Sequence, residues 1–183
     1  MSELSQIDRQ EFTDALARFN KKVLNPFTLS FAGRPYSPYA IVQHVGRKSG
    51  RQYTTPVVAR RTEEGFVIPL PYGEETDWHR NVQAAGEAVI ASQGHAYHVA
   101  KPEVVDAAEG IKAYGPPVTW LLESADVQQY LRIRRVPDAP LGRAAYEQLI
   151  KEYPITRAVK VLGGAAALVA AAVLIIRLLK RRE

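Results

Sequence analysis

In the segment Gly46–Arg51, two glycines bracket two cationic side chains and a serine, and a third cation, Arg51, follows the second glycine. The segment lies between two short apolar runs. Glycine allows a positive φ and lets another group approach the backbone closely. Successive free backbone N–H groups in such a turn form a concavity that binds anions, and guanidinium and ammonium groups add charge-assisted donors. The pattern therefore indicates a site for a phosphate or a carboxylate. A solvated hairpin turn with ordinary basic residues is the alternative interpretation of the same segment.

The stretch from Gly46 to Val57, GRKSGRQYTTPV, closely resembles the signature of the deazaflavin (F420)-dependent nitroreductase family. A second block follows at a matching separation and comprises Leu70–Gly73, Thr76–Val82 and Ala84–Gly86. The resemblance spans Phe19 to Val136 and implies an α+β fold, a split β-barrel of about six antiparallel strands with flanking helices. It also implies that the chain binds F420 and passes a hydride to a lipophilic acceptor such as a quinone or a nitroaromatic compound.

The same resemblance implies roles for individual residues. The basic turn would hold the phosphate and the acidic tail of F420, and the strand after it would run along the cofactor. The backbone near Pro71 and Tyr72 would lie against the deazaflavin ring. As a separate hypothesis of our own, Tyr72 is the catalytic proton donor to the reduced acceptor. The implied cofactor-binding residues are Arg47, Lys48, Ser49, Gly50, Tyr53, Thr54, Thr55, Pro56, Val57, Pro71, Tyr72, Asp77, Trp78 and Asn81.

Other functions on the same fold stay open, because one fold hosts many activities. A carrier or sensor would bind a flavin, haem or lipid without turnover, and an FMN-dependent reductase would not need the whole basic run, since FMN has no polyglutamate tail. No metal site is expected, because the chain has no cysteine and His95 and His98 fall on opposite faces of a predicted strand. The spacing of nucleotide-binding phosphate loops and the G-x-S-x-G motif of hydrolases are both absent from the sequence.

The net charge of +5 belongs to the end of the chain, because six basic residues and one acidic residue follow from Arg157 onward. The rest of the sequence is neutral overall, so we expect no nucleic-acid partner. The stretch Val161–Ile176 has no polar side chain, and the flanking Lys160 and Arg177 can reach the bilayer surface. We expect a single C-terminal membrane helix that contacts lipid. The alternative is a helix that lies at the membrane surface or is buried by packing within the protein or an oligomer.

The N-terminus has no apolar signal-peptide core. The expected location is therefore the cell membrane, with the catalytic domain on the cytoplasmic side. A homodimer is compatible with this arrangement. The expected organisation is an amphipathic helix and loop (1–38), a split-barrel cofactor-binding domain (39–137), a linker and helix (138–156) and a hydrophobic anchor helix with a basic end (157–183).

Hydrophobic periodicity and breakers place the elements of the barrel domain. Prolines at positions 69 and 71 require the strand that holds them to be an edge strand or locally irregular. Asp77 is expected to cap a short helix, and Gly86 to end it. The predicted elements are a helix (Asp8–Val23), a hairpin (Ala40–Val45 and Gln52–Arg60), a strand (Phe66–Tyr72), a helix (Asp77–Ala85), a hairpin (Ala88–Ser92 and Ala96–Val99), helices Val104–Tyr114 and Pro117–Ser124, a strand (Val127–Val136) and a helix (Leu141–Tyr153).

Overall fold

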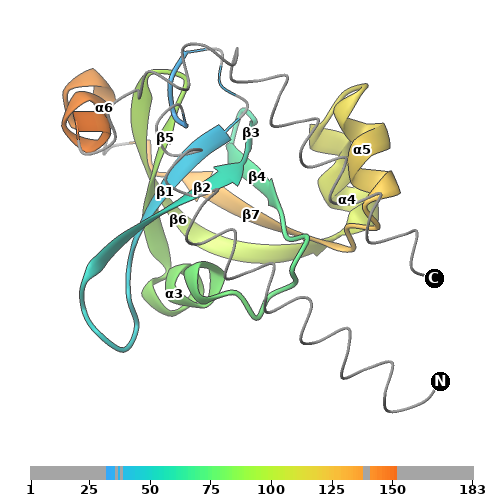
Figure 1. Cartoon of the computed structure of the whole chain (residues 1–183), viewed down its shortest axis with the longest axis horizontal. Helices are drawn as coiled ribbons and strands as arrows, with labels where there is room; N and C mark the ends of the chain where they lie inside the picture. The colour runs from blue at the N-terminus through green and yellow to red at the C-terminus, as the bar shows by residue number, and fades with distance from the viewer. Residues whose placement is uncertain (1–31, 36, 38, 138–140, 152–183) are drawn as a thin grey trace, which may run out of the picture.

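The computed structural model describes residues 32–35, 37, 39–137 and 141–151. This part of the chain is built on one antiparallel sheet of seven strands in the order β2-β1-β5-β6-β7-β4-β3 (Figure 1). The strands are β1 (Tyr39–Val45), β2 (Gln52–Val58), β3 (Arg60–Arg61), β4 (Gly65–Pro69), β5 (Glu87–Ser92), β6 (His95–Asp106) and β7 (Gln129–Arg135). The helices are α3 (Asp77–Ala85), α4 (Ala107–Gly110), the 3-10 turn η2 (Ile111–Ala113), α5 (Val118–Ser124) and α6 (Gly142–Lys151).

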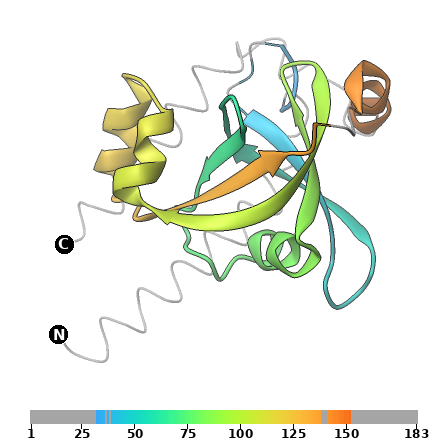
Figure 2. The same ribbon diagram turned by 180° about the vertical axis from the view of Figure 1, so that it is seen from behind.

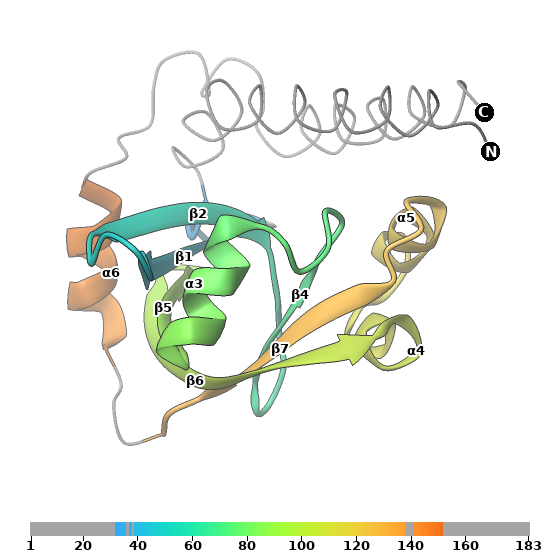
Figure 3. The same cartoon turned by 90° about the horizontal axis from the view of Figure 1, so that it is seen from below.

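The sheet curls into a half-barrel, so that β2 near one end of the sheet also contacts β4 near the other. Figure 3 shows α3 against the hollow side of this half-barrel, with α6 at one end and α4 and α5 at the other. The predicted α+β class is confirmed. The sheet has seven strands where about six were expected, and the short β3 accounts for the difference.

The interior of the half-barrel is filled by apolar side chains from six strands and from α3. The strand residues alternate, so every second side chain of a strand reaches this interior. Val82 and the partly buried Trp78 bring α3 into the same cluster, which fixes the helix against β1 and β5. The buried members are Ala40, Val42, Val57, Phe66, Ile68, Leu70, Val82, Ala88, Ile90, Val99, Leu131 and Ile133.

Figure 2 shows α6 at one end of the sheet and α4 and α5 at the other. Under each of these groups of helices the outer face of the sheet carries a smaller apolar cluster. At one end, Tyr146 and Leu149 of α6 cover Ile41 and Ala91 of the sheet. At the other end, α4, η2 and α5 cover residues of β4, β6 and β7, among them the fully buried Tyr130. Both faces of the sheet are therefore buried at its ends.

Two predicted elements agree closely with the structure. The first hairpin pairs Tyr39 with Val58 and Val45 with Gln52, so that the basic segment forms its turn. The helix Asp77–Ala85 has the predicted bounds and ends at Gly86, whose φ of 72° is left-handed. The second hairpin and the strand near the end of the domain are also present, as β5–β6 and β7.

The helix predicted to begin at Val104 is wrong at its start. Val104, Val105 and Asp106 continue β6 and pair with β7 beyond a register shift at Ala100 and Glu103. This long-range pairing overrides the helical pattern of the local sequence, and the helix begins only at Ala107.

At Pro69 the proline-bearing strand has the edge position that was one of the two predicted possibilities. Pro69 is the last residue of β4, and β3 pairs only with Phe66 and Val67, so β7 is the one described strand that pairs with Pro69. Proline has no backbone N–H to donate, but no described strand pairs with Pro69 on the side away from β7. No hydrogen bond between described strands is therefore lost there.

Several expectations lie outside the described residues, namely the helix over Asp8–Val23 and the C-terminal hydrophobic helix after residue 157. Within the part of the chain that the structure describes, no helix is long and apolar enough to cross a membrane. The domain boundaries given above stay predictions.

Candidate functional site

The turn between β1 and β2 is shaped by its two glycines. The amide of Gly46 donates to the carbonyl of Arg51 at 2.8 Å, and the amide of Gly50 donates to the carbonyl of Gly46 at 2.8 Å. Gly50 has a φ of 65°, which favours glycine. A Cβ on Gly46 would lie 2.6 Å from a ring carbon of Tyr53 and 2.7 Å from Oγ of Ser49, so the close packing of the turn on β2 requires glycine there.

The backbone of the turn is not the concavity of free amides that the sequence predicts. The amides of residues 49–51 are bonded inside the turn, and the amide of Arg47 donates to Oδ1 of Asn81 at 3.1 Å. Among the described residues, Lys48 is the one position of 47–51 whose amide has no hydrogen bond to another described residue. The prediction of successive free amides is wrong because the turn closes on itself. Side chains must therefore provide most of the donors to any anion.

Arg47 fastens the turn to α3. Its Nη1 donates to Oδ1 of Asn81 at 2.9 Å and to Oδ1 of Asp77 at 3.0 Å. Asp77 is the first residue of α3 rather than its cap, because Thr76 occupies the N-cap position without a side-chain hydrogen bond. The side chain of Asp77 is 83% exposed, so this ion pair is weak, whereas Asn81 is 6% exposed and its bonds to Arg47 carry most of the attachment.

His44 lies on β1 beside this attachment and is 5% exposed. Its Nδ1 is 3.3 Å from Nδ2 of Asn81, and its Nε2 is 3.2 Å from Oγ1 of Thr55. Because Oδ1 of Asn81 accepts from Arg47, its Nδ2 is the group that donates to His44. The proton of the neutral imidazole is therefore on Nε2 and is donated to Thr55. Burial lowers the pKa of His44 below its ordinary value, and the negative charge of Asp77 opposes this effect.

Sequence reasoning missed His44, although the sequence holds a signal for it. His44 follows Ala40 and Val42 at steps of two in a predicted strand. Both of those residues belong to the interior cluster of the half-barrel. A polar residue at the next inward position must find hydrogen-bond partners, so it is a candidate member of a site.

Strand alternation divides the predicted residues of β2 between two faces. Val57 packs in the interior cluster, and Tyr53 and Thr55 share its face. Thr54 and Pro56 point to the opposite face. The structure thus brings Tyr53 and Thr55 to the side of α3, and places Thr54 and Pro56 away from it.

The exposed end of the site carries two cations and two hydroxyls. Oγ of Ser49 is 3.1 Å from the hydroxyl of Tyr53, whose ring stacks on His44 with 6.0 Å between the ring centres. Lys48 and Arg51 are exposed, and neither forms an ion pair with another residue that the structure describes. The turn therefore presents positive charge that no described carboxylate neutralises.

Pro71 and Tyr72 lie in a separate turn that follows β4. The amide of Leu70 donates to the carbonyl of Gln129 at 2.9 Å, and the amide of Gly73 donates back to the carbonyl of Leu70 at 2.9 Å. Both Pro71 and Tyr72 are exposed, Tyr72 by 47%. The segment from this turn to α3 is held by Glu74, whose carbonyl accepts from Nδ1 of the buried His79 at 2.9 Å.

Trp78 is a packing residue of α3 in this structure. It is partly buried against the interior cluster, and the rings of Trp78 and His79 meet edge to face with 5.9 Å between their centres. Its predicted role in cofactor binding stays a prediction, as do those of the other residues named from the sequence.

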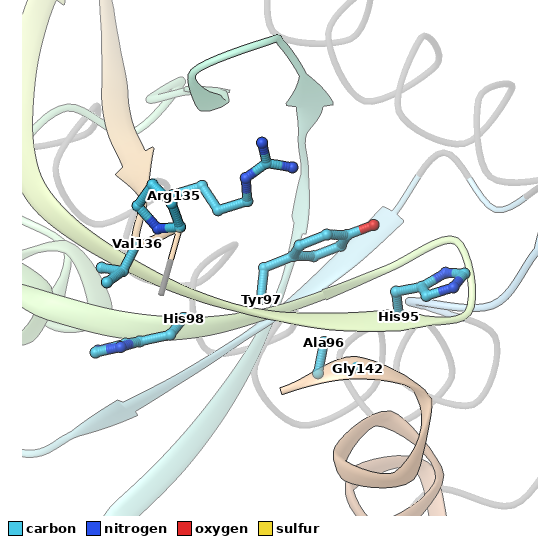
Figure 4. Close-up of a pocket in the computed structure, with 8 residues that line it drawn as sticks. His95, Ala96, Tyr97, His98, Arg135, Val136 and Gly142 are labelled. Carbon is cyan, nitrogen blue, oxygen red and sulfur yellow. The ribbon is translucent and has the colours of Figure 1, made fainter. Parts of the chain in front are cut away.

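A pocket of about 270 Å³ lies elsewhere, where β6 runs past the end of β7 and the start of α6 (Figure 4). His95 and His98 point away from each other in this view. His98 is 2.9 Å from a carboxylate oxygen of Glu87, and the hydroxyl of Tyr97 accepts from Arg61 at 3.1 Å. The lining residues are His95, Ala96, Tyr97, His98, Arg135, Val136, Pro137 and Gly142.

This pocket contains none of the predicted cofactor-binding residues. No group of three potential metal ligands occurs among the residues that the structure describes. Three polar side chains of the pocket, those of His95, Tyr97 and His98, are bonded to other described residues, and Arg135 is the one cation among its described lining residues. The turn presents two cations without a described carboxylate partner, beside the hydrogen-bond network that joins it to α3. The candidate site is therefore the β1–β2 turn together with α3.

Comparison with known sequences covers this same region. The family described as F420H(2)-dependent quinone reductase matches residues 17–121, more than half of the chain. The matched range includes the basic turn, His44, α3 and the turn after β4. No curated protein matches the chain at a significant level.

Solved structures with a similar fold are distant in sequence. HutZ, the heme storage protein from Vibrio cholerae, is 10% identical, with 55% of this chain and 83% of that one covered and a TM-score of 0.43. A structure titled F420 reductase is 14% identical, with coverages of 58% and 91% and a TM-score of 0.38. A structure titled F420-H2 dependent reductase (FDR-A) is 18% identical, with coverages of 51% and 92% and a TM-score of 0.37. At this distance the three likenesses say nothing about the site.

Proposed function

This chain belongs to the F420H(2)-dependent quinone reductase family, and we propose that it transfers a hydride from reduced F420 to a lipophilic acceptor such as a quinone or a nitroaromatic compound. By its membership of this family it is an F420-dependent oxidoreductase. The observation that carries the proposal is the family match over the basic turn and α3. The bound cofactor would supply the hydride, while the protein supplies binding, orientation and electrostatics.

The side chains of the turn fit an anionic cofactor tail. Lys48 and Arg51 are exposed and have no described carboxylate as a partner, and Ser49 of the same turn brings a hydroxyl that is 3.1 Å from the hydroxyl of Tyr53. Charge-assisted bonds from such groups suit phosphate and carboxylate oxygens. Arg47 is already bonded to Asp77 and Asn81 on α3, so we assign it to shaping the turn rather than to direct contact with the tail.

The turn after β4 is the proposed place of the deazaflavin ring. Pro69 and Pro71 have no N–H, so this backbone offers carbonyl acceptors rather than donors. Two-electron reduction of a quinone to a hydroquinone consumes one hydride and one proton, so a side chain beside the acceptor can deliver the proton and regain it from solvent. We assign this role to the hydroxyl of Tyr72, which is 47% exposed at the same turn.

We also propose that the apolar stretch Val161–Ile176 anchors the protein to the cell membrane, with the catalytic domain on the cytoplasmic side. An anchor would hold the site close to a lipid-dissolved acceptor. The support is the sequence alone, because this stretch lies outside the described residues. Flotation of the full-length chain with lipid vesicles tests it, and a chain ending at Lys151 that floats equally well would contradict it.

The test of cofactor binding is a titration of the full-length chain with F420 and with FMN, followed by tryptophan fluorescence. Trp78 lies next to Asp77, which bonds to the turn, whereas Trp120 is 59% exposed on α5. A Trp120→Phe background therefore assigns the signal to Trp78. We expect saturable quenching by F420 and much weaker quenching by FMN. Quenching by FMN alone would support the FMN-dependent alternative.

Turnover separates the reductase from a non-catalytic carrier. With reduced F420 and a short-chain quinone, oxidation of the cofactor should depend on the protein and saturate with quinone. Tight cofactor binding without oxidation by any quinone or nitroaromatic compound would favour a carrier of flavin, haem or lipid instead.

A further inference from the structure

We infer that His44 is a positioning residue of the anion-binding turn, and that protonation of its Nδ1 releases the turn from α3. His44 is not one of the residues predicted to bind the cofactor, and it acts on the turn through Asn81 and Arg47. The inference rests on the proposed function in one respect, because the affinity it controls is that for the F420 tail. The coupling between the protonation of His44 and the position of the turn involves only residues of this chain, so it can be tested without F420.

The geometry makes a continuous chain of hydrogen bonds from β2 to the turn. Nε2 of His44 donates a hydrogen bond to Thr55, and Nδ1 of His44 accepts one from Nδ2 of Asn81. Oδ1 of Asn81 in turn accepts hydrogen bonds from the backbone amide and from Nη1 of Arg47. Each buried polar atom in this chain has one role, donor or acceptor. The amide of Asn81 therefore has a single orientation that satisfies both neighbours.

Protonated His44 is incompatible with that orientation. An imidazolium donates from both nitrogens, so its Nδ1–H would face the donating Nδ2 of Asn81. Turning the amide over would satisfy His44 but would point Nδ2 at two donors of Arg47. In either orientation at least one donor of the Asn81 site faces another donor, so the attachment of the turn to α3 weakens.

The direction of the pH effect follows from the groups around His44. Asp77 on α3 raises its pKa, Arg47 lies beyond Asn81, and Tyr53 of β2 stacks on the ring. On the other neighbouring strand, β5, the nearest charged residue is Glu87, which is bonded to His98. Burial is the larger effect and lowers the pKa.

Neutral His44 is therefore favoured in the folded protein. The contribution of neutral His44 to the attachment of the turn is fully present above the ordinary histidine pKa of about 6.5. It is lost as the pH falls through the pKa of His44 in the folded protein, which is lower. The turn should hold at neutral pH and loosen in acid.

The test uses two substitutions at one position. In His44→Gln the side-chain oxygen can accept from Asn81 and the nitrogen can donate to Thr55, so the neutral bonding pattern is kept without a titrating group. His44→Leu removes both bonds. His98→Gln is the matched control, because His98 is bonded to Glu87 away from the turn.

The affinity of the full-length protein for F420 is measured by fluorescence from about pH 8 to about pH 5. The wild type and His98→Gln should lose about tenfold in affinity relative to His44→Gln over this range, the effect of about one lost hydrogen bond to a charged group. Titration of the cofactor itself cancels in the ratio of the affinities. His44→Leu should bind weakly at every pH. An equal pH dependence in wild type and His44→Gln overturns the inference and leaves the proposed function intact.

A second readout needs no cofactor. In the nitrogen NMR spectrum of the free protein, His44 should be the Nε2–H tautomer at neutral pH. The side-chain signals of Arg47 and Asn81 should shift in acid with the same midpoint as His44. A Nδ1–H tautomer, or Arg47 signals that ignore the titration of His44, would overturn the inference even if F420 does not bind.

Discussion

Removing the side-chain amide of Asn81 should destabilise the protein by about 3 kcal/mol. The amide makes three hydrogen bonds, two to Arg47 and one to His44, and the residue is 6% exposed. Each bond contributes about 1 kcal/mol, and Asn81→Ala leaves the buried Nδ1 of His44 without a donor. The ion pair of Arg47 with Asp77 cannot compensate, because the carboxylate is 83% exposed.

The assay is urea unfolding of the full-length chain followed by Trp78 fluorescence in the Trp120→Phe background. Arg80→Ala is the matched control, because Arg80 is on the same helix and pairs only with the exposed Glu75 among the described residues. The control should lose less than about 1 kcal/mol. If Asn81→Ala loses no more than the control, the hydrogen-bond chain does not hold the turn, and the reasoning about the site fails.

Two further substitutions test the account at separate points. Gly110→Ala should destabilise the protein by at least about 2 kcal/mol, because the new Cβ would lie 2.2 Å from Cγ of the buried Tyr130, whereas Gly115→Ala meets no atom within 4 Å and should change little; thermal unfolding compares the two. Lys48→Glu should weaken F420 binding at least about tenfold without changing stability, while Lys112→Glu, with the same charge change on η2, should bind normally; equal affinities would remove the turn from the site.

Local rules explain the parts of the fold that the sequence predicts well. The turn Gly46–Arg51 has a glycine where φ is positive, and α3 ends at Gly86 for the same reason. Short apolar runs on either side of glycine turns located the strands of both hairpins. These patterns depend on residues that are close together in the sequence, so the local structure that they favour is the structure found in the folded chain.

The missed features depend on contacts between distant segments. Val104–Asp106 is a strand because β7 pairs with it, and Asp77 bonds to the turn rather than capping its own helix. Arg47 was expected to hold an anion, yet its partners on α3 are 30 and 34 positions away in sequence. His44 was overlooked because its partners, Asn81 and Thr55, are adjacent only after folding.

Mapping F420 on the isotope-labelled protein by changes in amide chemical shift tests the central claim most directly, because the pocket beside β6 and the β1–β2 turn are separate places. The account predicts the largest changes at residues 46–51 and at Leu70–Gly73, with smaller ones along α3. Changes concentrated at His95–His98 and Arg135 would place the cofactor in the other pocket and contradict the assignment of the site.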